Sequence, residues 1–124
     1  MTAIAHGVKA QSTWDRPWSG ARHSYMAAVR DPENDNPVRW YVATNPSGTN
    51  KAVYNTDYTF ITPGYNESSG MLEGTALYVI EIEWGANLAD KTDYFIFIEV
   101  DDKATKCTNR KALRVQTQSV FNAF

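Results

Sequence analysis

The sequence predicts an all-β protein, an antiparallel immunoglobulin-like β-sandwich of about seven to nine strands. Apolar and polar residues alternate in many short segments, and turn residues separate these segments at the spacing of a sandwich. No segment shows the apolar stripe of an amphipathic helix. The 124 residues, 43% of them hydrophobic and 13% aromatic, suffice for one folded domain with a single core.

The first half of the chain is expected to form short strands. The third of them shows the clearest alternation, because Val38, Trp40 and Val42 fall on one face, as in a half-buried strand. The polar loop Asp31–Pro37 precedes it, and turns containing Pro and Gly separate other segments. The expected strands are Lys9–Trp14, His23–Arg30, Val38–Thr44, Ala52–Tyr54 and Tyr58–Thr62.

The longest strands are expected in the second half, after a loop rich in Gly, Ser and Asn. Thr75–Trp84 becomes charged only at Glu81 and Glu83, so we expect its first half to be covered on both faces. Tyr94–Asp101 carries apolar residues on both faces, which is typical of a central strand. The remaining elements are a polar turn over Asp102–Arg110 and a last strand over Ala112–Thr117, with Leu113 and Val115 inward.

Two features favour an immunoglobulin-like sandwich over the alternatives of a jelly roll or an open barrel. Trp40 lies in the middle of the third strand, where immunoglobulin-like domains commonly bury a tryptophan. The segment from Asp90 to Tyr94 has the form of a tyrosine corner, in which the phenol hydroxyl binds the backbone upstream. Ile96 stands where an antibody domain carries its second cysteine, so we expect apolar packing in place of a disulfide.

Both ends of the chain suggest contacts beyond one domain. Met1–Gln11 is interpreted as an N-terminal arm or as the remnant of a signal peptide, followed by a single domain over residues 12–124. Val120–Phe124 is apolar, so we expect a longer parent protein or a partner that receives this tail. Cys107 is the single cysteine and is expected to be a buried apolar group, or else an unpaired thiol that meets a partner.

The charge pattern limits the kinds of partner. The net charge is −2, and the basic residues are scattered except for a loose cluster over Lys103–Arg114. We interpret this cluster as a solvated loop and edge strand, and no nucleic-acid binding is predicted. No apolar run approaches the roughly 20 residues that cross a bilayer, so no membrane insertion is predicted.

Several segments together resemble a known class of repeat. They are Pro17–Gly20 with Ala21–Tyr25, Val38–Val42, Tyr78–Trp84, Tyr94–Val100, and Cys107 before Leu113–Val115. The pattern resembles the Ig-like or PKD-like repeats of secreted Bacteroidetes surface proteins, found in gliding motility and type IX secretion contexts. It departs from them at Lys106, where a glycine is missing, and in the acidic loop Asp31–Asn36. The resemblance implies export, a secreted or cell-surface location, and a role as a spacer, adhesin segment, filament component or secretion accessory.

The sequence shows no catalytic constellation, and we predict that the chain is not an enzyme. Neither of its two histidines has a nucleophile-elbow sequence nearby. The carboxylates of Glu81 and Glu83, and those of Glu99 and Asp101, share a strand face in a spacing that loosely suits a glycosidase. A solvated sheet face explains both pairs equally well.

The loop Asp31–Pro37 is the candidate metal site. Asp31, Glu33 and Asp35 offer the hard oxygen ligands that calcium takes. An EF-hand loop needs a bidentate Glu at its twelfth position, where this sequence has Val42. The alternative is a polar turn, and no cofactor besides calcium is predicted.

Aromatic residues supply candidate surfaces for a protein interface or for stacking on a sugar ring, with core packing as the alternative. They are Trp14, Trp18, Trp84, Phe121 and Phe124. The leading hypothesis is a non-catalytic structural or assembly module that binds a protein partner, or itself, through edge strands or termini. The alternative is a carbohydrate- or calcium-binding module.

Overall fold

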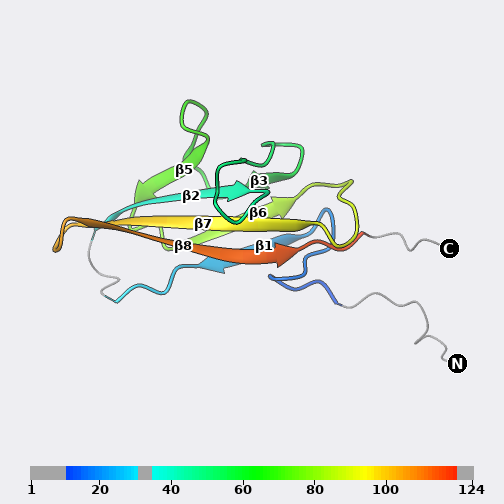
Figure 1. Ribbon diagram of the computed structural model, residues 1–124, viewed down its shortest axis with the longest axis horizontal. Helices are drawn as coiled ribbons and strands as arrows, with labels where there is room; N and C mark the ends of the chain where they lie inside the picture. The colour runs from blue at the N-terminus through cyan, green and yellow to red at the C-terminus, as the bar shows by residue number, and fades with distance from the viewer. Residues whose placement is uncertain (1–10, 31–34, 120–124) are drawn as a thin grey trace, which may run out of the picture.

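Eight β-strands form two sheets in the computed structural model, which describes residues 11–30 and 35–119 (Figure 1). The strands pair antiparallel, and the described residues include no helix, which confirms the all-β prediction. The strands are β1 (Arg22–Met26), β2 (Pro37–Ala43), β3 (Tyr58–Phe60), β4 (Tyr65–Asn66), β5 (Met71–Thr75), β6 (Val79–Trp84), β7 (Asp93–Asp102) and β8 (Cys107–Gln116).

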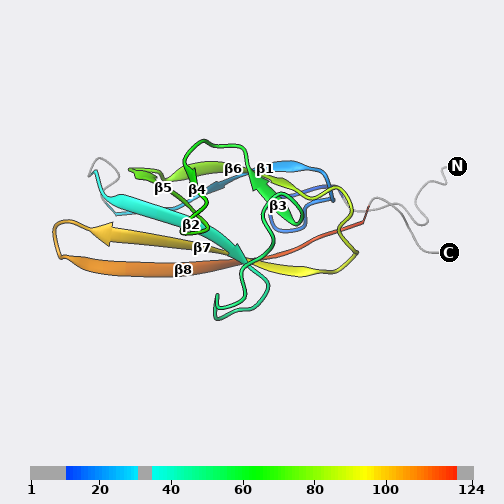
Figure 2. The same ribbon diagram turned by 90° about the horizontal axis from the view of Figure 1, so that it is seen from above.

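The strand order is that of an immunoglobulin-like sandwich. The smaller sheet has the order β1-β6-β3 and the larger has the order β4-β5-β2-β7-β8 (Figure 2). The chain changes sheets at every step except from β4 to β5 and from β7 to β8, so it passes between the sheets five times. In immunoglobulin strand letters, β1-β6-β3 correspond to B-E-D and β2-β7-β8 to C-F-G, while the β4–β5 hairpin extends the larger sheet beyond β2.

The position of strand A, beside β1, carries no strand in the described part of the chain. Instead, the segment before β1 meets the end of β8: the Ser19 N–H donates to the Gln118 carbonyl at 2.8 Å, and the Gln118 N–H donates to the Pro17 carbonyl at 2.8 Å. β1 and β8 are therefore the edge strands of different sheets. They lie at the same margin in Figure 1 and in different layers in Figure 2.

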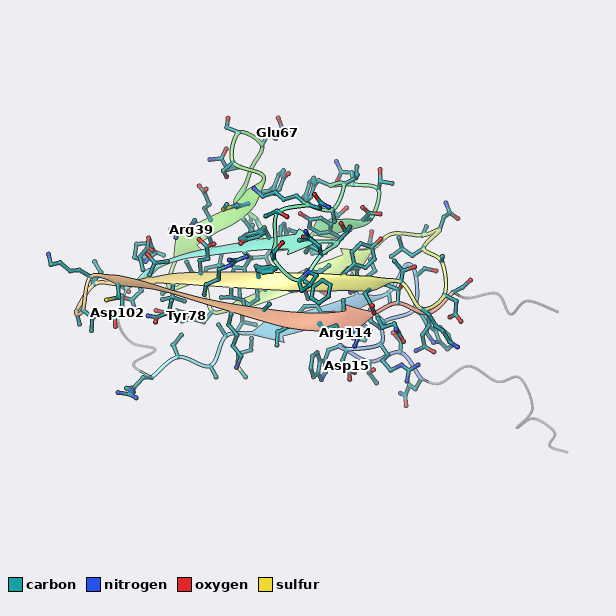
Figure 3. The ribbon with its side chains drawn as sticks, viewed as in Figure 1. Asp15, Arg39, Glu67, Tyr78, Asp102 and Arg114 are labelled. Carbon is teal, nitrogen blue, oxygen red and sulfur yellow. The ribbon has the colours of Figure 1, made fainter. Side chains whose placement is uncertain are left out.

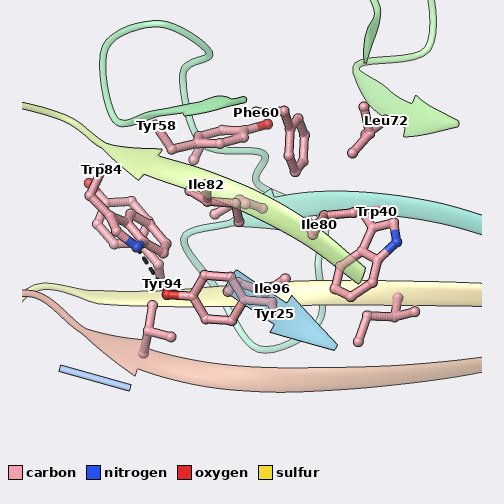
Figure 4. Packing of buried hydrophobic residues seen from close by; sticks show 14 of the residues in the cluster. Tyr25, Trp40, Tyr58, Phe60, Leu72, Ile80, Ile82, Trp84, Tyr94 and Ile96 are labelled. Carbon is pink, nitrogen blue, oxygen red and sulfur yellow. Dashed lines mark hydrogen bonds between the residues drawn. The ribbon is translucent and has the colours of Figure 1, made fainter. Parts of the chain in front are cut away.

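The core between the sheets confirms the predicted roles of Trp40 and Ile96, which are both 0% exposed. The Trp40 indole donates from Nε1 to the Leu77 carbonyl at 2.8 Å, so its polar atom is satisfied inside the core. The Trp84 indole likewise donates to the Tyr25 hydroxyl at 3.0 Å (Figure 4). Apolar packing thus occupies the space where an antibody domain has its disulfide.

Tyr94 lies at the predicted corner, at the start of β7, but the predicted partner of its hydroxyl is wrong. The hydroxyl donates to Oδ1 of Asp57 at 2.9 Å instead of to upstream backbone. Oδ2 of Asp57 accepts the Val53 N–H at 2.7 Å, so the carboxylate links the loop before β3 to β7. Asp90 acts elsewhere, because its Oδ1 accepts the Ser119 N–H at 3.1 Å.

The predicted strand Thr75–Trp84 is wrong as a single element. Its alternation is continuous, but the backbone turns at Ala76, which has a φ of 52°. Thr75 therefore ends β5, and β6 begins at Val79, which is 57% exposed instead of covered on both faces. β4 and β5 form a hairpin in a region where the sequence predicts a loop up to Gly70.

Other boundaries also differ from the prediction. The described end of the expected strand Lys9–Trp14 forms no strand, and Ala52–Tyr54 contributes only an isolated bridge at Tyr54. β1 ends at Met26, the last residue paired with β6, instead of at Arg30. β8 begins already at Cys107, because the polar segment before Ala112 pairs with β7 throughout.

The outer face of the larger sheet has a small core of its own. Tyr41 and Phe97 stack with ring centroids 5.0 Å apart, and each is at most 5% exposed. The Arg110 guanidinium lies 4.3 Å from the Phe97 ring centroid and donates to the Ser47 carbonyl. The loop after β2 therefore helps to cover the Tyr41–Phe97 part of this face.

Candidate functional site: an open sheet edge beside an apolar groove

β8 has a strand neighbour on one side only. All ten of its residues pair with β7, and no strand among the described residues lies on its other side. Two hydrogen bonds show in which direction successive backbone groups point. The Thr117 N–H donates to the Thr92 carbonyl at 2.8 Å, towards β7. The Gln116 N–H donates to the Asp15 carbonyl at 2.9 Å, on the side away from β7. Even-numbered residues therefore direct their backbone groups away from β7.

Four even-numbered residues carry this open edge: Thr108, Arg110, Ala112 and Arg114. Their N–H and C=O groups form a row with no strand beside it in the described structure. Such a row is a template for an added strand. The side chains alternate with the same period, so Val115 and Leu113 point inward while Arg110 and Arg114 lie on the outer face.

An apolar groove of about 440 Å³ lies next to this edge, between the two sheets. Ile98, Val100 and Leu113 line it from the larger sheet, and the segment from Met26 to Val29 lines it from the other side. The groove forms because β1 ends at Met26, whereas the β7–β8 hairpin extends further (Figure 1). The inner face of that hairpin therefore has no strand of the smaller sheet to cover it.

Exposed apolar side chains border the groove. Met26 is 68% exposed and its cross-strand partner Val79 is 57% exposed. A second hollow, of about 530 Å³, lies on the other flank of the Met26–Val29 segment and includes Ala76 and Leu77. An apolar segment with hollows on both flanks is typical of an interaction surface.

β8 carries only basic charge. Its sequence contains Arg110, Lys111 and Arg114 and no Asp or Glu. Arg114 forms an ion pair with Asp93 at 3.0 Å and lies near Asp15 at the C-terminal end of the strand (Figure 3). Lys111 lines the groove, and no ion pair of Lys111 occurs within residues 11–30 and 35–119.

The carboxylates on the neighbouring strand are already engaged. Arg39 donates to Glu99 at 3.0 Å and to Asp101 at 2.7 Å, and Thr108 donates to Asp101 at 2.6 Å. The hydrogen bonds from Arg39, followed by that from Thr108, lower the pKa of Asp101 to about 2. An ionised Asp101 bound to Arg39 is suited to join β7 to β2 and β8, and it is unsuited to proton transfer at neutral pH.

Among the described residues, His23 and Ser12 form a contact that resembles part of a catalytic site. Oγ of Ser12 lies 2.7 Å from Nε2 of His23, and the same oxygen accepts the Trp18 N–H at 3.1 Å. Burial lowers the pKa of His23. Within the described residues, no carboxylate bonds the other ring nitrogen, so the contact attaches the N-terminal segment to β1 and lacks the orienting acid of a triad.

The predicted calcium ligands are only partly visible. Asp31 and Glu33 lie outside the described residues, and Asp35 is exposed. Over the described ranges, no group of three His, Cys, Asp or Glu side chains could hold a metal ion. Calcium binding at this loop stays a prediction.

The candidate aromatic residues do not form one surface. Trp84 is 1% exposed, so its predicted role in an interface or in sugar stacking is wrong: it packs in the core against Tyr25 and Tyr94. Trp14 is 49% exposed, and Trp18 is half-buried beside Gln118. Phe121 and Phe124 lie outside the described residues.

For Cys107 the prediction of a buried apolar group is wrong, whereas the alternative of an unpaired thiol that meets a partner stays a prediction. The residue is exposed at the start of β8 instead of buried, because this end of the strand extends beyond the smaller sheet. The sequence analysis assigned the cluster Lys103–Arg114 to a solvated loop and edge strand, and β8 is an edge strand, but it did not identify this edge as the candidate binding surface. The one signal for it was the basic cluster Lys103–Arg114, since charged residues are frequent on edge strands.

Comparison of the chain with protein-family models, with characterised proteins and with solved structures finds no match. Within the described residues, no helix is long and apolar enough to span a membrane. The class defined by fold and site is therefore an immunoglobulin-like β-sandwich with one open, basic sheet edge.

Proposed function

We propose that this chain is a non-catalytic assembly module that binds a protein partner by adding a strand of that partner to β8. The observation that carries the proposal is the row of outward backbone groups on β8 next to the apolar groove. Backbone groups on an open edge supply hydrogen bonds for an added strand, and a neighbouring groove takes alternate side chains of that strand. The proposed site thus offers both affinity and specificity to an extended segment.

The proposal extends to the setting of the protein. An assembly role agrees with the resemblance to repeats of exported surface proteins, so we place the chain outside the cell or on its surface. The arm Met1–Gln11 and the tail Val120–Phe124 are proposed as further contacts in the assembly. Gln11 is exposed, while residues 1–10 and 120–124 lie outside the described residues.

A proline at Ala112 tests the proposed use of this edge. The Ala112 N–H points away from β7, so Ala112→Pro removes a donor from the open edge and leaves the β7–β8 ladder intact. Peptides selected from a random display library against the chain should bind the wild type, and Ala112→Pro should weaken them about tenfold or more. Binding is measured by fluorescence anisotropy.

Ala112→Ser is the matched control, because it changes the side chain at the same position but keeps the backbone N–H of residue 112. It should bind the selected peptides with affinity within about twofold of the wild type. Thermal unfolding checks that both variants fold. The proposal fails if the library yields no binder, or if Ala112→Pro binds the selected peptides as well as Ala112→Ser does.

A further inference from the structure

We infer that the partner of the β8 edge is an acidic extended segment, in which carboxylate side chains alternate with aliphatic ones. This inference rests on the proposed function and names the chemistry of the partner. It follows from two properties of the same edge: the sign of its charge and the apolar lining of the groove beside it.

The charge of β8 favours an acidic strand over a second copy of this chain. A second β8 placed antiparallel beside the first would bring Arg110, Lys111 and Arg114 near the same three cations. Like charges on neighbouring strands destabilise the pair, and basic side chains commonly protect a sheet edge from self-association. Carboxylates on the added strand reverse the sign of this interaction.

The positions of these cations define where the carboxylates are needed. Arg114 is paired with Asp93 and Arg110 lies 4.0 Å from Glu99, but their side chains are 62% and 45% exposed, so both remain accessible to a carboxylate on the outer face of the sheet. Lys111 lies at the groove, on the inner face. Acidic residues on the outer face of the added strand therefore reach the two arginines, and one at the groove rim reaches Lys111.

The groove defines the other half of the pattern. Side chains of a strand alternate between its two faces, so every second residue of the added strand points between the sheets. There it meets Leu113 and Val100 on one side and the Met26–Val29 segment on the other. Apolar residues make up more than half of the lining, which also contains Asn36, Asp102 and Asn109, so aliphatic side chains such as valine fit its apolar part and gain by leaving water.

The same edge suits nucleic acid less well. Asp93, Glu99 and Asp101 on β7 weaken the field that any polyanion meets, but an acidic strand also gains a ladder of backbone hydrogen bonds along β8, which a phosphate chain cannot form. Base stacking needs an accessible aromatic face. Of the two rings on the outer face of β7, Phe97 is 2% exposed because Arg110 covers it, and Phe95 is partly buried against the Tyr41–Phe97 pair.

Defined peptides test the inference on the full chain. The first peptide alternates Val and Glu over about ten residues, the second alternates Val and Lys, and the third alternates Ser and Glu. Backbone amide shifts of Thr108, Arg110, Ala112 and Arg114 report docking at the edge, and anisotropy gives the affinity. We expect the Val–Glu peptide to move these amides and to bind at least about tenfold more tightly than either other peptide.

A charge reversal at the groove rim sharpens the test. Lys111→Glu should weaken the Val–Glu peptide about fivefold, and a higher salt concentration should weaken it further. Lys91→Glu is the matched control, since it changes the net charge equally at an exposed turn before β7, where no strand pairing is lost. It should leave the affinity within about twofold of the wild type.

Different failures have different meanings. If the Val–Lys peptide moves the β8 amides with equal or higher affinity, the acidic partner is overturned while the proposed function stands. If none of the three defined peptides and no library-selected peptide moves these amides, both the inference and the proposed function are overturned. An oligouridylate that binds these amides more tightly than the Val–Glu peptide, or dimerisation of the chain through β8, also overturns the inference.

Discussion

The hydroxyl of Tyr94 donates a 2.9 Å hydrogen bond to Oδ1 of Asp57, and this bond joins the two sheets at one end of the sandwich. Tyr94 is the second residue of β7 in the larger sheet, whereas Asp57 directly precedes β3 in the smaller one. Burial is the main reason why the pKa of Tyr94 is raised, so the hydroxyl stays protonated and remains a donor at any physiological pH. In this domain the hydroxyl of the corner tyrosine thus binds a side-chain carboxylate instead of a backbone carbonyl.

Removal of this hydroxyl should destabilise the fold. Tyr94→Phe is expected to lower the free energy of unfolding by about 2 kcal/mol, because it leaves a carboxylate oxygen without its donor. Tyr65→Phe is the control, since the contacts of Tyr65 are ring contacts, and it should change the free energy by less than about 0.5 kcal/mol. Urea unfolding measures both. Equal effects of the two variants would show that the Tyr94–Asp57 bond is not a structural link.

Asp101 should make stability depend on pH in the acid range. Its pKa is about 2 in the folded chain against an ordinary value of 3.8. The ionised form is therefore favoured by folding, so its stabilising contribution is complete above pH 3.8 and is lost as the pH falls towards 2. Because the side chain is 38% exposed, we expect a contribution of only about 1 kcal/mol.

Asp101→Asn tests this assignment. The variant should be less stable than the wild type at pH 6 by about 1 kcal/mol, and the difference should shrink as the pH falls towards 2. Chemical unfolding at several pH values gives both numbers. A difference that stays constant over this range would contradict the ion pair with Arg39 as its origin.

The two tryptophans Trp84 and Trp14 should differ sharply in their effect on stability. Trp84→Ala removes a fully buried ring and is expected to lower the free energy of unfolding by about 3–5 kcal/mol. Trp14→Ala removes a ring that is half exposed and should cost less than about 1 kcal/mol. Denaturant unfolding followed by circular dichroism compares them. Similar losses for both would contradict the assignment of Trp84 to the core and Trp14 to the surface.

Cys107 should react with thiol reagents in the folded state. Its side chain is exposed at the start of β8, so a maleimide or an aromatic disulfide should modify it without denaturant. Cys107→Ser should leave the free energy of unfolding within about 0.5 kcal/mol of the wild type. Modification that requires denaturant would instead place the thiol in the interior.

Alternation predicted the central elements correctly for a physical reason. β2 and β7 each have one face in the core. The apolar residues on that face, among them Trp40 in β2 and Ile96 in β7, therefore repeat with the period of a strand. The same signal failed at Ala76, because alternation continues through a turn that only the positive φ reveals. It also failed at the N-terminal half of β8, since an edge strand beyond the smaller sheet has no core face to make apolar.

The site was harder to predict than the fold. A strand forms an open edge when no other strand pairs with one of its sides. Pairing is fixed only when the sheets assemble, so a local sequence pattern does not reveal it. The sequence contains the basic residues Arg110, Lys111 and Arg114, yet a solvated loop explains them equally well. The groove likewise arises from the different lengths of β1 and the β7–β8 hairpin, which no local pattern encodes.

Amide hydrogen exchange along β8 tests the central claim most directly. In the isolated chain, the amides of Asn109, Lys111 and Leu113 bond to β7 and should be protected, whereas those of Arg110 and Ala112 should exchange at least about tenfold faster. A bound partner strand should slow exchange of the latter pair alone. Equal protection of all five amides in the isolated monomer would show that the edge is already closed, and would contradict the account.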